Sequence, residues 1–272
     1  MGKYYPIQLS EEYIASITSS GDATGLSAYD KIIKYAEESF ACDIDVGKED
    51  LVKALLYCAG KRFLSESNSI QNDSAYKKVK TFAEKAVARL RQESNFEGAT
   101  VSDFVQSLLI PLAFEKWQKT KIVYQMSNEI IEDVESVVNP IVSIKGLDNV
   151  PSPFWIDLSD NSKKEKGILV AFVNTGTDII VIGWSFADDN INNYHVYYTG
   201  FSIADANEVE IATTPCKGID ASFILNFISF IQSIFVEIKE SDLTKNTYKP
   251  YKEEAVKNKF SEVRIFEVGM KE

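Results

Sequence analysis

Residues 167–186 read GILVAFVNTGTDIIVIGWSF, and this stretch decides the fold class of the chain. Its first seven residues are apolar without interruption, which is typical of a strand in the interior of a sheet. Residues 174–177 combine asparagine, threonine and glycine as a hairpin turn does. Residues 178–186 then return as a second strand. The sequence therefore predicts an antiparallel hairpin in the middle of a sheet.

The segments on either side extend this hairpin into a meander. We expect a short strand at 154–158, a second turn at 188–193 and a further strand at 194–203. Alternate residues of the strand at 194–203, beginning with Tyr194, should share one face. A last strand is expected at 263–268, at an edge of the sheet.

The longest uncharged stretch of the chain is residues 221–236. It is shorter than the roughly 20 residues that span a bilayer, and it contains Asn226 and Gln232. We expect a buried helix over 221–239, because a helix that is apolar nearly all round must be covered on most sides. Laid on one face of the sheet, it gives an α+β fold in which an apolar helix packs an antiparallel β-meander.

The N-terminal half has the period of helices instead. Apolar residues recur there at helical spacing, and polar or glycine-containing segments separate the runs. Asp73 or Ser74 is expected to cap one helix. Pro111 lies inside another and predicts a kink or a break, because proline lacks a backbone donor. The helical runs cover residues 9–17, 27–40, 51–63, 79–90 and 102–117.

The segment from Pro140 to Pro153 holds three prolines together with glycine and asparagine, and it is expected to be a linker. We therefore expect a helical domain over residues 1–138 and an α+β domain over residues 139–272.

The charge balance argues against nucleic acid as a partner. The chain has 29 basic and 40 acidic side chains, a formal net charge of −11. Nucleic-acid binding draws much of its affinity from lysine and arginine. Residues 245–264 are a basic exception, and we expect a solvated segment there rather than a phosphate site.

The chain shows no signal of secretion or of membrane insertion. Residues 1–10 lack the apolar core of a signal peptide. The three cysteines form no CxxC pair, and an odd number does not complete a disulfide framework. We expect a cytoplasmic protein with free thiols and no membrane partner.

Motifs that carry catalysis are weak. The single histidine, His195, excludes zinc sites that use two or three histidines. Phosphate-binding loops, the GxGxxG fingerprint and the GxSxG elbow are all absent from the sequence. Asp188, Asn190 and Asn192 match the first ligand positions of a calcium loop, but the sixth and twelfth positions do not fit, so a hairpin loop is expected.

Two pairs of reactive side chains remain. Asp157 and Glu165 suggest a metal-dependent nuclease pair, and Cys216 with His195 suggests a thiol pair. A structural role is expected for each of them, because nothing in the sequence orders a third group. We expect no metal and no cofactor.

Aromatic side chains concentrate on adjacent predicted strands. One face of the sheet must meet the apolar helix, and the other is available to show rings such as Trp184 or Tyr197 to solvent. Exposed tyrosine and tryptophan are enriched in protein interfaces, and packing in the core is the alternative role. The candidate binding residues are Trp155, Asp157, Trp184, Tyr197 and Tyr198.

Three short patterns lie between Trp117 and Phe186: KTKIVY at 119–124, PSPFWIDL at 151–158 and GILV at 167–170. This region, about a quarter of the chain, resembles a group of uncharacterised proteins from phages and mobile elements of Gram-positive bacteria. The group shares T-K-x-x-Y, P-x-x-[aromatic]-[aromatic]-I-[DE] and G-[aliphatic]-[aliphatic]-V segments. It brings no catalytic residue with it, and what it implies is a phage or mobile-element accessory protein.

Together these observations favour an accessory protein that binds a host or competing protein rather than an enzyme. Inhibition of a defence system is the sharpest form of this hypothesis, because acidic surfaces can occupy basic nucleic-acid clefts. One alternative is a small-molecule or nucleotide-binding protein, or a hydrolase that uses carboxylates. Another is a structural or assembly protein of a virion. The sequence leaves open whether the chain forms a homo-oligomer.

Overall fold

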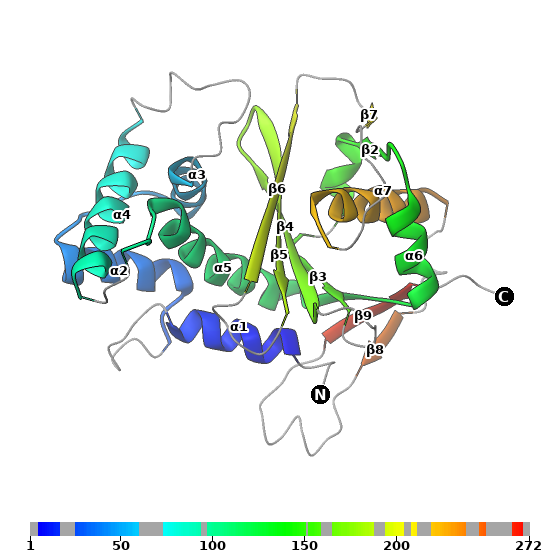
Figure 1. Ribbon diagram of the computed structural model, residues 1–272, viewed down its shortest axis with the longest axis horizontal. Helices are drawn as coiled ribbons and strands as arrows, with labels where there is room; N and C mark the ends of the chain where they lie inside the picture. The colour runs from blue at the N-terminus through cyan, green and yellow to red at the C-terminus, as the bar shows by residue number, and fades with distance from the viewer. Residues whose placement is uncertain are drawn as a thin grey trace, which may run out of the picture. The chain divides into compact units, whose positions relative to one another are not determined.

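The chain divides into two compact units, each described here by itself. One unit is Ser10–Glu115, and the other combines Met1–Leu9 with Lys116–Glu272. The computed structural model (Figure 1) describes residues 5–16, 25–59, 73–93, 97–150, 152–158, 165–187, 194–203, 208–210, 219–237, 245–248 and 263–268.

The Ser10–Glu115 unit is built of helices, as expected for the N-terminal part. Its elements are most of α1 (Tyr5–Ser16), α2 (Ala28–Phe40), α3 (Lys48–Cys58), α4 (Ser74–Glu93) and most of α5 (Val101–Thr120). Phe82 of α4 is fully buried in an aromatic cluster. The rings of Tyr35, Phe40 and Phe104 meet it edge to face, with centroids 5.4 to 6.1 Å away. This geometry is favoured by aromatic pairs and fixes how α2, α4 and α5 pack.

The start of α4 and the course of α5 test two sequence predictions. The Asp73 carboxylate accepts hydrogen bonds from the backbone N–H groups of Ala75 and Tyr76, so Asp73 is the cap. The break expected at Pro111 is wrong, because α5 continues through this residue from Val101 to Thr120. Proline removes one backbone hydrogen bond, and buried apolar residues in the flanking turns hold the helix together.

The second unit contains a seven-stranded sheet with the order β6-β5-β4-β3-β1-β9-β8. The strands are β1 (Ile122–Met126), β3 (Phe154–Asp157), β4 (Gly167–Asn174), β5 (Asp178–Phe186), β6 (Tyr194–Ser202), β8 (Lys245–Tyr248) and β9 (Val263–Val268). Strands β3 to β6 pair antiparallel in sequence order, which confirms the predicted meander. The tight turn between β4 and β5 places Gly176 at a φ of 96°, in the region that favours glycine.

The sheet is mixed rather than antiparallel throughout. Strand β1, which the sequence did not predict, pairs parallel with both β3 and β9. Strand β9 therefore lies inside the sheet, between β1 and β8, and the expectation of an edge position is wrong. Two of the segments that carry the resemblance lie side by side here, because Val123 is paired with Trp155.

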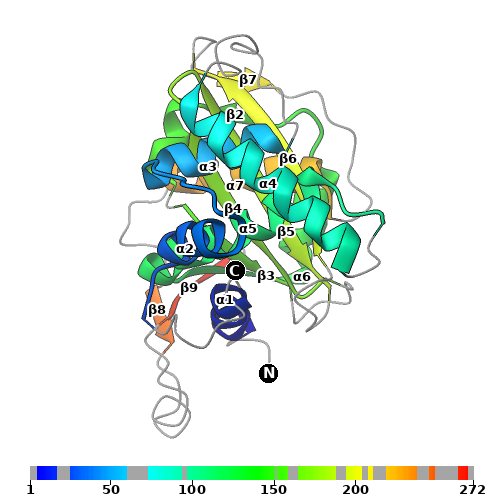
Figure 2. The same cartoon turned by 90° about the vertical axis from the view of Figure 1, so that its left-hand side faces the viewer.

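The segment expected to be a linker is part of the folded sheet unit. It contains β2 (Ile141–Ser143) and a 3-10 helix, η3 (Lys145–Asn149). The side chains of Val142, Ile144, Leu147 and Val150 are buried, so the described part of this segment belongs to the packed core and is not a flexible connection. Strand β2 pairs antiparallel with β7 (Glu208–Glu210), and the two lie together in Figure 2. The division between units also falls earlier than residue 138, because β1 and α6 (Asn128–Ser136) belong to the sheet unit.

Helix α7 (Ala221–Glu237) lies along one face of the meander, as the sequence predicted (Figure 1). It approaches closely at Gly183 of β5, where a side chain of even one carbon atom would overlap Ile224 Cδ1. The shared core on this face consists of α7 residues and inward-facing strand residues, among them Phe223, Phe227, Ile228, Phe154, Ile168, Val170 and Val181. The chain is therefore of the α+β class. None of the described helices combines the length and apolar character needed to cross a membrane.

Candidate functional site

The strand register sorts the five candidate residues onto two faces of the sheet. Leu169 is paired with Trp155 on one side and with Trp184 on the other, so both indoles share a face. Asp157 and Tyr198 occupy alternate positions of the same face. Tyr197 lies on the opposite face, which α7 covers. The structure thus brings four of the five candidates together on one face and separates Tyr197 from them.

The two indoles of this group are buried. Trp155 is 0% exposed and stacks on Phe186, with ring centroids 5.7 Å apart. It also lies over Gly167, where a Cβ atom would overlap its ring. Trp184 is 1% exposed, so of the two roles left open for this ring it has the one in the core and does not face solvent. A tryptophan surrounded by apolar neighbours is more stable packed against them than in water.

The other members of the face are also withdrawn from water. Asp157 is 6% exposed, at the end of β3 opposite Gly167. Tyr198 is half-buried, and burial raises the pKa of its hydroxyl because the charged form is disfavoured away from water. Four of the candidate residues therefore contribute to packing, and the rings do not form an open aromatic surface.

Tyr197, on the α7 face, is surrounded by polar groups that sequence reasoning did not assemble. The ring is half-buried and packs against the core. Burial raises the pKa of its hydroxyl, the Ser185 hydroxyl lowers it, and the Glu165 and Asp220 carboxylates raise it. Asp220 also accepts a hydrogen bond from the Phe223 N–H at the start of α7. The Ser185 hydroxyl and the Glu165 and Asp220 carboxylates thus all influence the Tyr197 hydroxyl.

His195 lies next to this polar group without forming a catalytic arrangement with it. It is exposed and is paired in register with Ser185, which is buried. The described residues contain no group of three histidine, cysteine or acidic side chains close enough to hold a metal ion. The local signal that could have placed His195 beside Ser185 is the hairpin register of β5 and β6.

An acidic surface is formed by α6. The helix is capped by Ser127, whose hydroxyl accepts a hydrogen bond from the Ile130 N–H. One side of the helix is buried, and the other presents exposed carboxylates. Three of these, Glu129, Glu132 and Asp133, make no side-chain hydrogen bond or ion pair within the part of the chain that is described. Their charges are therefore available to a partner.

The sequence around this helix is acidic as well. Residues 122–237 contain sixteen acidic and five basic side chains, a difference equal to the net charge of the whole chain. In contrast, the ion pairs that join Lys34 to Glu38, Lys80 to Glu84 and Arg89 to Glu93 lie in the helical unit. Negative charge is thus concentrated in residues 122–237, the segment that contains α6.

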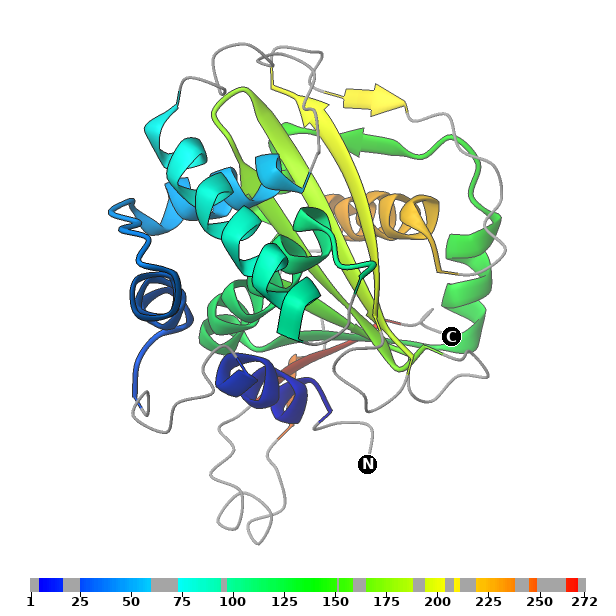
Figure 3. The ribbon, with the colours of Figure 1, turned by 60° about the vertical axis from the view of Figure 1, so that its left-hand side comes forward.

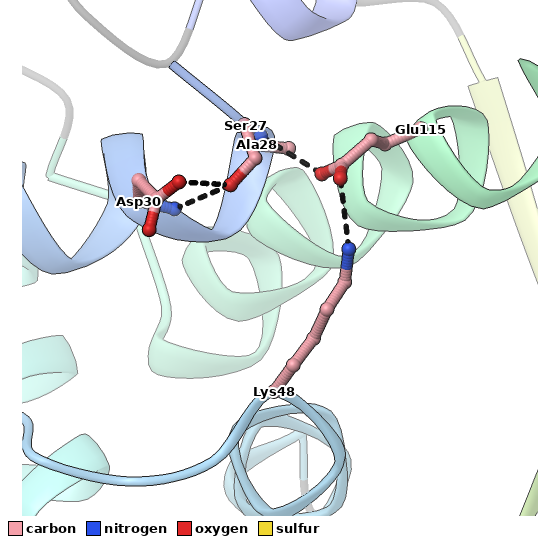
Figure 4. A network of polar contacts seen from close by, with 5 residues as sticks. All are labelled: Ser27, Ala28, Asp30, Lys48 and Glu115. Atoms are coloured by element: carbon pink, nitrogen blue, oxygen red, sulfur yellow. Dashed lines mark hydrogen bonds and ion pairs between the residues drawn. The ribbon is translucent and has the colours of Figure 1, made fainter.

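A polar cluster in the helical unit has a structural role (Figure 4). Glu115 of α5 accepts a hydrogen bond from the Ala28 N–H at 2.8 Å and pairs with the Lys48 ammonium group at 2.9 Å. Beside it, Ser27 caps α2 by accepting from the Asp30 N–H. One carboxylate therefore joins the first residues of α2 and α3 to α5, where helix N-termini favour negative charge.

The remaining candidates from the sequence are partly outside the described residues. Cys216, the loop at 188–193 and residues 249–262 of the basic segment all fall there. Cys42 and Cys58 are free thiols. Burial raises the pKa of Cys58 to about 12, so its thiol stays protonated and unreactive at neutral pH.

No protein-family model matches this chain, and no curated protein matches it. Among solved structures, one described as "Crystal structure of AcrVA2" is similar with a TM-score of 0.38 and 14% sequence identity. The match covers 89% of this chain and 84% of that one. A likeness at this level carries no argument about what this chain does.

Proposed function

We propose that this protein binds a host protein stoichiometrically and presents to it the acidic surface of its sheet unit. In the sharpest form of the proposal it is an accessory protein of a phage or mobile element that inhibits a defence system. The observation that supports the binding proposal is the three exposed carboxylates of Glu129, Glu132 and Asp133 on α6, which make no ion pair within the described residues, in a segment of sixteen acidic and five basic side chains.

The charge pattern defines the chemistry of the partner. Exposed carboxylates that lack ion pairs within the described residues retain their attraction for cations on another molecule. Complementary charge steers two proteins together and excludes partners of like charge. The partner should therefore present lysine and arginine side chains, as the nucleic-acid-binding clefts of many proteins do.

The first test is affinity purification of the tagged protein from host lysate, at low and at high salt, with identification by mass spectrometry. We expect one dominant protein with a basic surface, whose recovery falls as salt screens the charges. Recovery of background proteins only, at both salt concentrations, would count against the proposal.

Charge variants separate a specific surface from general acidity. The variant E129Q/E132Q/D133N removes three negative charges from α6 and should weaken binding to the recovered partner by about tenfold or more. The control E37Q/D43N/D45N removes three exposed charges from the helical unit and should leave binding within about twofold. Equal losses for the two variants would show that α6 is not the contact surface.

A further inference from the structure

The two ends of the seven-stranded sheet differ in how they are protected against pairing. Strand β8 at one end has four residues, and its sequence begins with Lys245. Strand β6 at the other end has nine residues, YHVYYTGFS, and contains no lysine, no acidic residue and no proline. Natural edge strands are kept from pairing by shortness, charge, proline or a bulge. Strand β6 is long and has no lysine, acidic residue or proline. Its register with β5 is continuous over all nine residues, so it contains no bulge either.

The outer backbone groups of β6 can be assigned from its pairing. Ile203 donates its N–H to Thr177, its direct partner across the hairpin. Because bonded and non-bonded pairs alternate along an antiparallel ladder, Val196, Gly200 and Ser202 direct their N–H and C=O groups away from β5. Within the described residues, these three make no hydrogen bond on that side. Figure 3 shows β6 at the border of the sheet beside β5.

We propose that β6 pairs with β6 of a second copy of this chain, antiparallel about a two-fold axis at Tyr198, to form one continuous sheet. An antiparallel pair centred on Tyr198 leaves none of the nine residues without a partner. It places Val196 opposite Gly200 of the second copy on each side of the axis, and the two pairs exchange about four hydrogen bonds. This inference does not depend on the proposed function.

Charge makes β6 suited to a second copy of an acidic protein. Two molecules that each carry a net charge of −11 repel each other, and contact between acidic surfaces such as α6 adds to the repulsion. Strand β6 has no charged residue at neutral pH, so contact through this strand adds no repulsion between charged side chains at the interface. Raising the salt concentration should therefore tighten the dimer, whereas it should weaken the binding of a basic partner.

The surface left open on β6 is sufficient for a weak dimer. All nine residues of β5 are buried, whereas eight of the nine residues of β6 are partly or fully exposed. Three of these eight are half-buried tyrosines, and a tyrosine buries about 150–250 Å² when it is covered completely. Because about half of each ring is already buried, the tyrosines of two copies add roughly 450–750 Å², which is below the roughly 1,200 Å² at the lower limit of stable interfaces. We expect a dissociation constant on the order of 10 µM.

The test is the mass of the full-length protein in solution, by sedimentation equilibrium from about 2 to about 200 µM, with low and high salt. We expect a monomer that becomes a dimer over this range, and tighter association at high salt. The variant Val196→Pro removes an outward N–H and spares the bonds to β5, so it should weaken the dimer about tenfold or more. A monomer at all concentrations, or a dimer that Val196→Pro leaves unchanged in a folded variant, would overturn the proposal.

Cysteine crosslinking tests the register independently. In the variant Tyr198→Cys, the two new thiols face each other across the axis at a Cα separation of about 5.5 Å, within the range of a disulfide. Mild oxidation with copper phenanthroline should join the two copies. In the control Tyr194→Cys, the two thiols lie roughly 27 Å apart and should not crosslink above the level of the parent protein. Equal crosslinking of the two variants would contradict a pair centred on Tyr198.

Discussion

Single residues set how closely the elements of the sheet unit approach each other. Gly167 is the clearest case, because the Trp155 indole occupies the space where a side chain would be. The indole is fully buried and stacked on Phe186, so it has no room to move aside. Strand β4 therefore begins with glycine for a reason of packing.

This contact predicts the cost of the smallest substitution. Gly167→Ala should lower the free energy of unfolding by about 1–3 kcal/mol, because a methyl group would overlap the Trp155 ring. Urea unfolding monitored by tryptophan fluorescence measures this loss. Gly98→Ala is the matched control, since no atom lies within 4 Å of the position that its methyl group would take, and it should change stability by less than about 0.5 kcal/mol. Equal stability of the two variants would show that Trp155 does not pack on Gly167.

Glu115 is a second residue with a measurable contribution. In Glu115→Ala, the Ala28 N–H and the Lys48 ammonium group lose their acceptor, and we expect a loss of about 1–3 kcal/mol. Glu38→Ala removes an exposed pair with Lys34 at 3.8 Å and should cost less than about 0.5 kcal/mol. Urea midpoints of the two variants, compared with the parent protein, make the measurement. A small effect at Glu115 would mean that water replaces the carboxylate there.

At the scale of elements, α7 is held by polar residues as well as by apolar ones. Asn226 donates from its amide to the carbonyl oxygens of Val134 and Val137, at 2.8 and 3.1 Å. Gln232 accepts from the Ser143 N–H and donates to the Ser143 carbonyl, both at 2.8 Å. The two residues that interrupt the apolar pattern of the sequence thus connect α6 and β2 to the helix, together with Ser229, whose hydroxyl donates to the Ile141 carbonyl of β2 at 2.7 Å.

These bonds give a prediction at the level of the element. Gln232→Leu keeps the size of the side chain but leaves both backbone groups of Ser143 without their partner, so we expect a loss of about 2 kcal/mol. Hydrogen exchange at the Ser143 amide should accelerate together with the loss of stability. The control Ser222→Ala changes a half-buried serine of the same helix that makes no side-chain hydrogen bond within the described residues. Unchanged protection of Ser143 would contradict the role of Gln232.

Elements made of neighbouring segments could be predicted from the sequence, and distant pairings could not. The hairpin at 167–186 is visible because two apolar runs flank a turn, and the apolar helix because its pattern is continuous. Strand β1 was missed because it has five residues directly after a helix, and its parallel partner β9 begins at Val263. Parallel pairing leaves no turn signal nearby, so neither β1 nor the interior position of β9 is visible locally.

The same limit applies to the candidate site. The sequence placed Trp155 and Trp184 on strands of one meander, and the register shows that they share a face on either side of Leu169 in β4. Their burial depends on what packs over that face, which no local pattern reports. The group around Tyr197 combines Glu165, Ser185 and Asp220 from three separate segments, so only the folded chain assembles it.

For the whole molecule, tyrosine and cysteine side chains whose pKa is raised by burial determine how the free energy of unfolding changes at alkaline pH. Burial is the largest cause that raises the pKa of the tyrosine hydroxyls and of the Cys58 thiol, the latter to about 12. The tyrosines concerned are Tyr35, Tyr124, Tyr197 and Tyr198. In the unfolded chain the same groups lose their protons at about pH 10 for tyrosine and about pH 8.5 for cysteine. The unfolded state therefore ionises first as pH rises.

Stability should accordingly be fully present below about pH 8 and fall from there through about pH 12. Each group contributes a slope of at most about 1.4 kcal/mol per pH unit between its unfolded and folded pKa values. Urea midpoints measured between about pH 7 and pH 11 test this, with Cys58→Ala as the control that should reduce the slope above about pH 8.5. A midpoint that stays constant up to pH 11 would mean that these groups ionise as easily in the folded protein as in the unfolded chain.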